Sequence, residues 1–241
     1  MLTGASDLRT EAARGPDGAS SSPPAEPKSD GGTTSEDGSS SEDAPTSGRI
    51  REITFESGSV TGMNGGDTAT GTPFVTTDGA LRGKYSMVVG GPKAFIATTF
   101  TGEDEIYASF TFAVAMFPEG DAAATIARIG FASPATTLDF SVRARGLVMS
   151  VGGASIAVEG VIGVGAPYRL GVHLVQAGDK MTIESFLVEG ATGSFGASGG
   201  PRIVTGSAGL INRIELGSLG AESLTAVFDQ LLIDSLAMPL P

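Results

Sequence analysis

A two-residue alternation of apolar and polar side chains limits the fold of this chain more than any other feature. Over residues 105–117 (EIYASFTFAVAMF) the even positions carry an apolar row: Ile106, Phe110, Phe112, Val114 and Met116. Alternate residues of a β-strand point to opposite faces, so the row predicts a long strand with one face in a core. Residues 138–142, 147–151 and 168–174 repeat the alternation. The sequence therefore predicts a protein built from β-strands.

Short turn signals rich in glycine separate the predicted strands. They include Gly90-Gly91-Pro92, Gly152-Gly153 and Ala177-Gly178-Asp179. Glycine supplies the positive φ of tight hairpin turns, and this spacing is typical of an antiparallel sandwich or barrel. We expect residues 167–175 and 180–190 to form a hairpin, and the terminal strands, 50–58 and 224–236, to lie side by side. A short helix over 120–128 is the best alternative to a strand in any part of this region.

Composition changes abruptly near Arg49. Residues 1–49 contain 10 Ser, 7 Gly, 5 Pro and no aromatic residue, with nine acidic side chains against four basic ones. Such a segment buries too little apolar surface to offset the entropy lost on ordering, so we predict a disordered acidic tail over 1–49. An inert spacer and an arm that orders on a partner both fit this composition. Residues 50–241 then form one domain, long enough to bury most of its apolar surface.

The composition excludes several classes of protein. The 241 residues include no Cys, no Trp and one His, which removes disulfides, Cys-based zinc sites and thiol nucleophiles. A formal net charge of -12 argues against binding to nucleic acid, which rests on clustered Lys and Arg. The first residues show no signal peptide, and no window approaches the roughly 18 apolar residues of a membrane span. We therefore expect the protein to be displayed on a virion or, if it leaves the cell without a signal peptide, on a cell surface.

Several phrases of the chain together resemble a known fold family. They are FESG at 55–58, GALRGKYSMVV at 79–89, IYASFTFAV at 106–114, the predicted hairpin, and VFDQLLIDSLAMP at 227–239. Their order, over about residues 52–239, resembles the concanavalin A-like and laminin G-like jelly rolls of bacterial surface proteins and phage structural proteins. The resemblance implies an all-β, two-sheet antiparallel jelly-roll sandwich. It implies no single activity, because this fold carries lectins, glycanases, adhesion modules and scaffolds.

The resemblance also implies a place for a metal ion. Modules of this family often hold a structural calcium where the first and last strands pair, and Glu56 and Asp229 match the two carboxylate positions. Carboxylate and carbonyl oxygens are the ligands that calcium prefers. The alternative is that both residues are ordinary solvated or capping carboxylates. We expect no other cofactor.

No pattern in the chain predicts a catalytic site. A retaining glycosidase needs two carboxylates about 5 Å apart. The nearest acidic cluster, Glu103-Asp104-Glu105, lies at a predicted turn and lacks the Glu-x-Asp-x-x-Glu pattern of the family's glucanases. His173 has no Gly-x-Ser-x-Gly nucleophile to serve, and the glycine clusters at 163–165 and 196–200 precede no helix and carry no Walker lysine. We expect no enzyme activity.

Alternation predicts a set of polar side chains on the concave face of the sandwich: Tyr107, Ser109, Arg143, Arg169 and His173. Arginine and tyrosine often anchor recognition, because one offers a fixed fork of donors and the other a rigid amphipathic ring. Polar residues that merely cover a sheet are the alternative interpretation. The expected function is a non-enzymatic recognition module for adhesion or glycan binding, with a glycan or surface protein as partner. A structural protein that assembles on a particle or as a homo-oligomer is the second hypothesis, and glycoside hydrolysis is the third.

Overall fold

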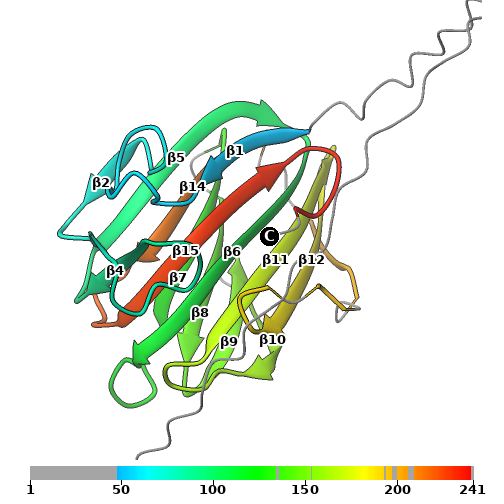
Figure 1. Cartoon of the computed structure of the whole chain (residues 1–241). Coiled ribbons are helices and arrows are strands. Elements are labelled where there is room, and N and C mark those ends of the chain that lie inside the picture. The colour runs from blue at the N-terminus through cyan, green and yellow to red at the C-terminus, as the bar shows by residue number, and fades with distance from the viewer. Residues whose placement is uncertain are drawn as a thin grey trace, which may run out of the picture. The chain divides into compact units, whose positions relative to one another are not determined.

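The computed structural model describes residues 48–133, 136–152, 154–192, 194–196, 200–205 and 209–239. Every regular element in these ranges is a β-strand, and the strands form two antiparallel sheets packed face to face (Figure 1). The predicted all-β jelly-roll sandwich is confirmed. Within these ranges no helix is long and apolar enough to span a bilayer. The tail predicted over 1–49 lies outside the described residues as far as residue 47.

The front sheet has eight strands. Across it run, in order, β3 (Phe74–Thr76), β4 (Ser86–Gly90), β15 (Thr225–Asp234), β6 (Glu105–Met116), β11 (Pro167–Ala177), β12 (Lys180–Glu189) and β13 (Arg202–Thr205). The first strand, β1 (Arg49–Ile53), pairs with the second half of β15, as predicted for the terminal strands. The predicted hairpin is also confirmed, since β11 pairs with β12 through a turn that sets Ala177 opposite Lys180.

The back sheet has seven strands. Their order is β10 (Ala154–Val161), β9 (Gly146–Val151), β8 (Thr137–Arg143), β7 (Ala124–Phe131), β14 (Ile211–Ser218), β5 (Ala94–Glu103) and β2 (Thr68–Thr70). The helix considered over 120–128 is wrong, because β7 occupies most of that segment. Ile129 and Phe131 are buried while Arg128 and Gly130 are partly exposed, which is the period of a strand.

The core lies between the two sheets. The front sheet contributes side chains such as Ile106, Phe112 and Phe228, and the back sheet contributes Phe140, all of them fully buried. Burying a side chain of this size stabilises the fold by roughly 1.5–3 kcal/mol. The apolar row of β6 also fixes how this strand pairs with its neighbours, because a slip of one residue would turn its polar side chains into the core. Met116, the last residue of the predicted apolar row, is instead 56% exposed, since β6 continues beyond the core.

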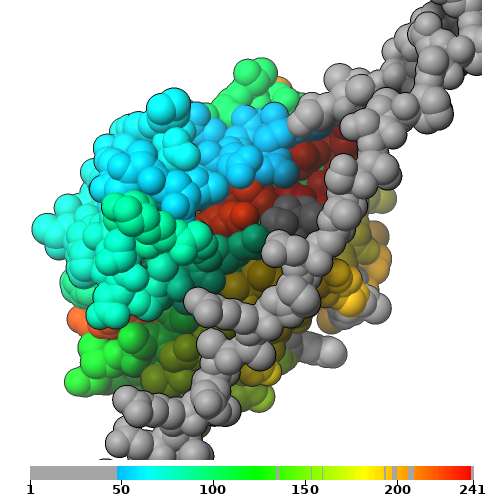
Figure 2. Space-filling view, viewed as in Figure 1, coloured from blue at the N-terminus to red at the C-terminus, as the bar shows by residue number. Residues whose placement is uncertain are grey.

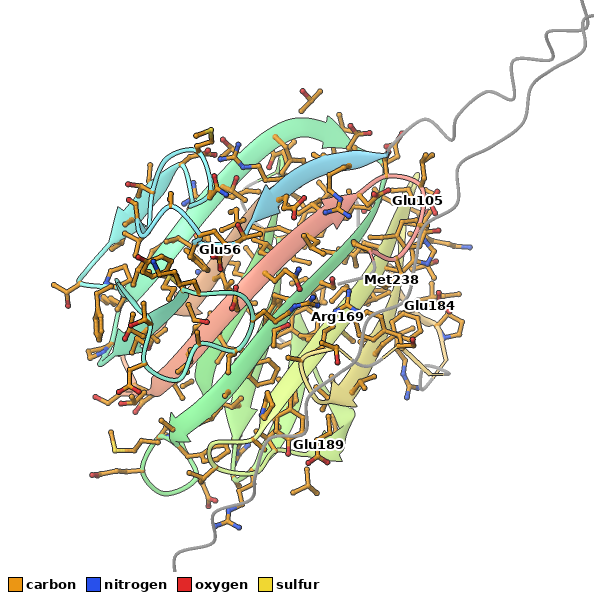
Figure 3. The ribbon with its side chains drawn as sticks, in the orientation of Figure 1. Glu56, Glu105, Arg169, Glu184, Glu189 and Met238 are labelled. Carbon is orange, nitrogen blue, oxygen red and sulfur yellow. The ribbon has the colours of Figure 1, made fainter. Side chains whose placement is uncertain are left out.

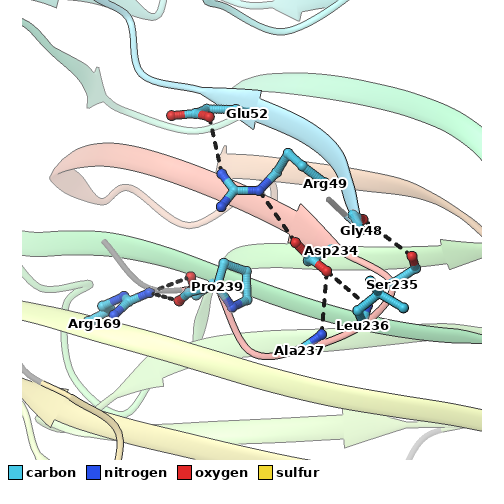
Figure 4. A network of polar contacts seen from close by, with 10 residues as sticks. Gly48, Arg49, Glu52, Arg169, Asp234, Ser235, Leu236, Ala237 and Pro239 are labelled. Atoms are coloured by element: carbon cyan, nitrogen blue, oxygen red, sulfur yellow. Dashed lines mark hydrogen bonds and ion pairs between the residues drawn. The ribbon is translucent and has the colours of Figure 1, made fainter. Parts of the chain in front are cut away.

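Three segments fold over the outer face of the front sheet. The loop between β3 and β4 reaches β15, where the Arg82 amide donates to Asp229 at 2.9 Å. The segment after β12 places the ring of Phe195 4.5 Å from the Arg169 guanidinium. The C-terminal segment turns back after β15, so that the Pro239 carbonyl accepts a hydrogen bond from Arg169 (Figure 4). In Figure 2 the red surface of β15 lies between the blue and cyan residues on one side and the olive and gold strands β11 and β12 on the other.

Candidate functional site

The outer face of the front sheet carries four of the five predicted ligand-binding residues. Tyr107 and Ser109 come from β6, while Arg169 and His173 come from β11. The two strands are antiparallel neighbours, and Tyr107 lies directly opposite His173. Arg143, the fifth residue, ends β8 in the back sheet. The expectation of one cofacial set is therefore wrong for Arg143, because alternation gives the face of a strand but not the sheet to which the strand belongs.

Tyr107 and His173 form a stacked pair of rings that two carboxylates hold in place. The ring centroids are 4.1 Å apart and the ring planes differ by 5°. His173 Nδ1 lies 2.9 Å from Glu184 Oε2, and His173 Nε2 lies 2.8 Å from Glu105 Oε1. The Tyr107 hydroxyl donates to the same Glu105 oxygen at 3.0 Å. We call these four residues the ring cluster.

The ring cluster is held together by hydrogen bonds and is partly open to solvent. The exposed fractions of the side chains are 18% for His173, 29% for Glu184 and 45% for Glu105. Hydrogen bonds from His173 and Tyr107 hold the pKa of Glu105 below its ordinary value. Burial and the Glu105 carboxylate raise the pKa of Tyr107, so its hydroxyl stays protonated. The cluster therefore presents aromatic surface beside a carboxylate that accepts hydrogen bonds.

The two carboxylates of the ring cluster are bridged by the His173 ring. The His173 imidazole lies between Glu105 and Glu184 and is hydrogen-bonded to one of them through each ring nitrogen. Of the neighbouring acids, Glu103 ends β5 and Asp104 lies between β5 and β6.

Arg169 and Ser109 lie together beneath the covering segments. Arg169 is 1% exposed, and its Nη2 donates to Ser109 Oγ at 3.0 Å and to the Pro239 carbonyl (Figure 4). Burial and then the positive charge of Arg82 lower the pKa of Arg169 to about 10. These two predicted residues therefore meet, but in a buried contact rather than on an open surface.

Glu56 and Asp229, the predicted calcium ligands, line one hollow of about 190 Å³ beside β15. Glu56 Oε1 accepts hydrogen bonds from the amides of Lys84 and Tyr85, at 2.9 and 3.3 Å. Asp229 Oδ2 accepts from the amide of Arg82 and, at 2.7 Å, from the Ser86 hydroxyl. Figure 3 shows Glu56 on one side of β15 and both Glu105 and Glu184 on the other. The hollow is thus separate from the ring cluster.

The hollow has two carboxylates that a hard cation could use, although Arg82 also lines it. Among the described residues, no Lys or Arg forms an ion pair with Glu56 or Asp229. Burial raises the pKa of Asp229 to about 6, and the Glu56 charge adds to this rise. In the described part of the chain no group of three His, Asp or Glu side chains is arranged to hold a metal ion, so Glu56 and Asp229 would hold the ion with backbone carbonyls or water. The calcium site stays a prediction.

Three further residues of this face, Glu184, Phe195 and Arg82, are not among the predicted ones. The position of Glu184 could have been predicted from the sequence, because a two-residue turn that pairs Ala177 with Lys180 also pairs His173 with Glu184. Phe195 and Arg82 come from irregular segments, and no periodic pattern shows where such segments fold.

Neither a protein-family model nor a curated protein matches the chain. The two sheets, with polar side chains on the outer face of one of them, define a jelly-roll module. The chain is similar to the cellulose-induced protein Cip1, with a TM-score of 0.55 and 21% identity over 77% of this chain and 97% of that one.

Two neurotoxin structures share the fold at lower identity. The binding domain of botulinum neurotoxin serotype D has a TM-score of 0.54, with 8% identity over 78% of this chain and 48% of that one. The binding domain of botulinum neurotoxin DC in complex with SialylT has a TM-score of 0.51, with the same identity and coverage. The chain spans about half the length of these domains. Likeness at these identities shows the fold alone, so the laminin G-like and phage features of the resemblance stay predictions.

Proposed function

We propose that the protein is a non-enzymatic carbohydrate-binding module that holds a glycan against the ring cluster. The observation that carries the proposal is the stacked Tyr107–His173 pair, fixed by Glu105 and Glu184. Aromatic rings offer apolar surface to the C–H faces of sugars, and carboxylates accept hydrogen bonds from sugar hydroxyls. Groups held in place before binding lose little freedom when a ligand arrives. The neurotoxin binding domains support a binding role, since they share the fold.

Two further parts of the proposal follow from other features. The His173 ring between Glu105 and Glu184 supports binding without hydrolysis. The predicted tail over 1–49 supports display on a virion or cell surface, because a flexible segment of that length would let the module reach a ligand.

A glycan array with the full chain tests the proposal. The wild-type protein should bind one class of sugar reproducibly. The variants Tyr107→Ala and Glu184→Gln should each bind about tenfold more weakly, because each removes an anchor worth roughly 1–2 kcal/mol. Arg143→Ala is the matched control, since Arg143 is exposed on the other sheet. A blank array with folded protein, or equal loss in the control, would contradict the proposal.

An assembly role is the second candidate, favoured by apolar side chains at one end of β6. Met116 is 56% exposed and Val164 is 59% exposed, and a bridge between Val114 and Val164 brings the two segments together. Exposed apolar groups that gather in one place favour contact with another protein. Under this alternative the array is blank, sedimentation depends on protein concentration, and Met116→Ser removes that dependence.

A further inference from the structure

The front sheet holds two guanidinium groups that lack an acidic partner. Arg169 is 1% exposed, and Arg82 lies in the loop between β3 and β4 that covers β15. In the described part of the chain no ion pair includes either residue. The Nη1 atom of each is buried and has no hydrogen-bond partner. Arg169 is buried whereas Arg82 is partly exposed, so the missing counterion is unfavourable mainly at Arg169.

Arg82 and Arg169 begin at the two ends of one row of the sheet, from where their side chains can extend toward each other. Asp229 on β15, Thr111 on β6 and Arg169 on β11 are successive partners across three strands. Arg82 begins above this row, because its amide donates to Asp229 at 2.9 Å. Neighbouring strands are about 4.8 Å apart, so the two arginines begin roughly 10 Å apart, a gap that two arginine side chains can span. The lowered pKa of Arg169, caused by burial and by the charge of Arg82, agrees with this approach.

A third unpartnered polar atom lies in the same row. Thr111 is fully buried, and its Oγ1 has no hydrogen-bond partner. Guanidinium nitrogens only donate hydrogen bonds, and a threonine hydroxyl is able to donate one. The chemical group missing from this row is therefore an acceptor, and the two positive charges call for a negative one.

Asp229 in this row and Glu56 beside it form no ion pair with either arginine in the described part of the chain. Asp229 uses its Oδ2 to accept from the Arg82 amide and the Ser86 hydroxyl, and Glu56 accepts from the amides of Lys84 and Tyr85. Both carboxylates therefore order the loop that carries Arg82 without pairing with its guanidinium. Arg169 Nη2 is engaged by Ser109 and by the Pro239 carbonyl, which leaves Nη1 for a further partner.

We propose that Arg82, Arg169 and Thr111 bind an oxyanion, the carboxylate or sulfate group of an acidic glycan. This inference rests on the proposed function, because it names the class of sugar that the same face would take. The planar fork of a guanidinium matches the paired oxygens of both anions. Thr111 is four residues from Tyr107 on β6, and Arg169 is four residues from His173 on β11. Four residues of a strand span roughly 13 Å, so one short oligosaccharide reaches from the ring cluster to the arginines.

Calorimetric titration of the full chain with three oligosaccharides of equal length tests the inference. One is neutral, one carries uronic acid residues and one carries sulfate esters. At least one acidic oligosaccharide should bind about tenfold or more tightly than the neutral one, as expected for hydrogen bonds to charged groups. Arg82→Gln should remove this preference, while Arg143→Gln should leave it unchanged. The acidic oligosaccharide with the larger preference identifies the anion.

Melting curves of the same variants separate a binding role from a structural one. In buffer of low ionic strength without added oxyanion, Arg82→Gln should melt no lower than the wild type, because it removes repulsion between two positive charges. Free glucuronate or sulfate at millimolar concentration should raise the melting temperature of the wild type more than that of Arg82→Gln. Arg82→Lys keeps the charge but loses the planar fork of donors. Free oxyanion should therefore raise its melting temperature less than that of the wild type and more than that of Arg82→Gln.

The outcomes distinguish this inference from the proposed function. Equal binding of the neutral and acidic oligosaccharides by wild type and Arg82→Gln overturns the anion site and leaves glycan binding intact. A response to free oxyanions that Arg82→Gln loses, with no oligosaccharide bound, supports the anion site and overturns glycan binding. No response to any of these compounds overturns both.

Discussion

Asp229 gives the clearest test of the electrostatics at one residue. Its pKa is about 6 in the folded protein, raised by burial from an ordinary value of 3.8. The folded state therefore holds this proton more tightly than the unfolded state does. Without metal, the contribution of Asp229 to stability should fall as pH rises from about 4 to about 6 and then level off, by up to about 3 kcal/mol. Asp229→Asn should flatten this dependence in urea titrations with chelator. A wild-type profile that the substitution leaves unchanged would contradict the assignment.

Bound calcium should offset the free energy of folding that is lost when the charged Asp229 carboxylate is buried. If Glu56 and Asp229 hold the ion, added calcium should raise the melting temperature at pH 7, and chelation should lower it again. Asp229→Asn should abolish the difference between the two melts. An unchanged wild-type melt on chelation would retire the calcium site.

The face of the sheet on which Arg169 lies could be predicted from the sequence, but its burial could not. Alternation correctly placed Arg169 on the face away from the core, together with Ser109 and His173. Its cover comes from Phe195 and Pro239, which lie 26 and 70 residues further along the chain. Neither segment has a periodic pattern, so its path over the sheet could not be predicted.

The two-residue period was the basis for most of the predicted strands. It identified β6 and β11, and the turn at Gly178-Asp179 fixed the register of the β11–β12 hairpin. The pairing of β1 with β15 was predicted from the place of the two strands at opposite ends of the domain, because sandwiches commonly pair their terminal strands. The assignment of β8 to the back sheet depends on contacts between distant segments, which is why Arg143 was placed on the wrong face.

Gly217 tests the pairing of β14 with β5. It lies opposite Phe95 with a φ of 139°, and a Cβ atom there would come within 2.5 Å of the Ala94 carbonyl oxygen. Gly217→Ala should therefore lower the free energy of unfolding by about 1–3 kcal/mol, measured by urea titration. Gly90→Ala at the end of β4 is the control, because nothing lies within 4 Å of a Cβ atom there. Equal stability of the two variants would contradict the close approach.

The division into a tail and a sandwich is a prediction for the complete chain. β1 begins at Arg49, which is where the composition of the sequence changes. Limited proteolysis of the full chain should therefore trim it to about residue 50 and then stop, because exposed segments of low hydrophobicity are cut first. Mass spectrometry of the product gives the boundary. Cleavage mainly within 100–190 would contradict it.

The front sheet gathers the features that point to recognition. The ring cluster, the Arg82–Arg169 pair and the Glu56–Asp229 hollow all lie on its outer face, although the chain as a whole carries a net charge of -12. The fold could be predicted from the sequence, and so could the shared face of four of the five residues predicted to bind a ligand. The arrangement of these groups could not, because it depends on three irregular segments that fold over the sheet.

Mass spectrometry of a bound glycan tests the central claim, binding without cleavage, most directly. The full chain is incubated with the sugar that it captures on the array, and the oligosaccharide is then released and weighed. The account predicts that the glycan is retained by the wild type, lost from Tyr107→Ala, and recovered at its original mass. Shorter products that appear with the wild type and disappear with Glu105→Gln would contradict it.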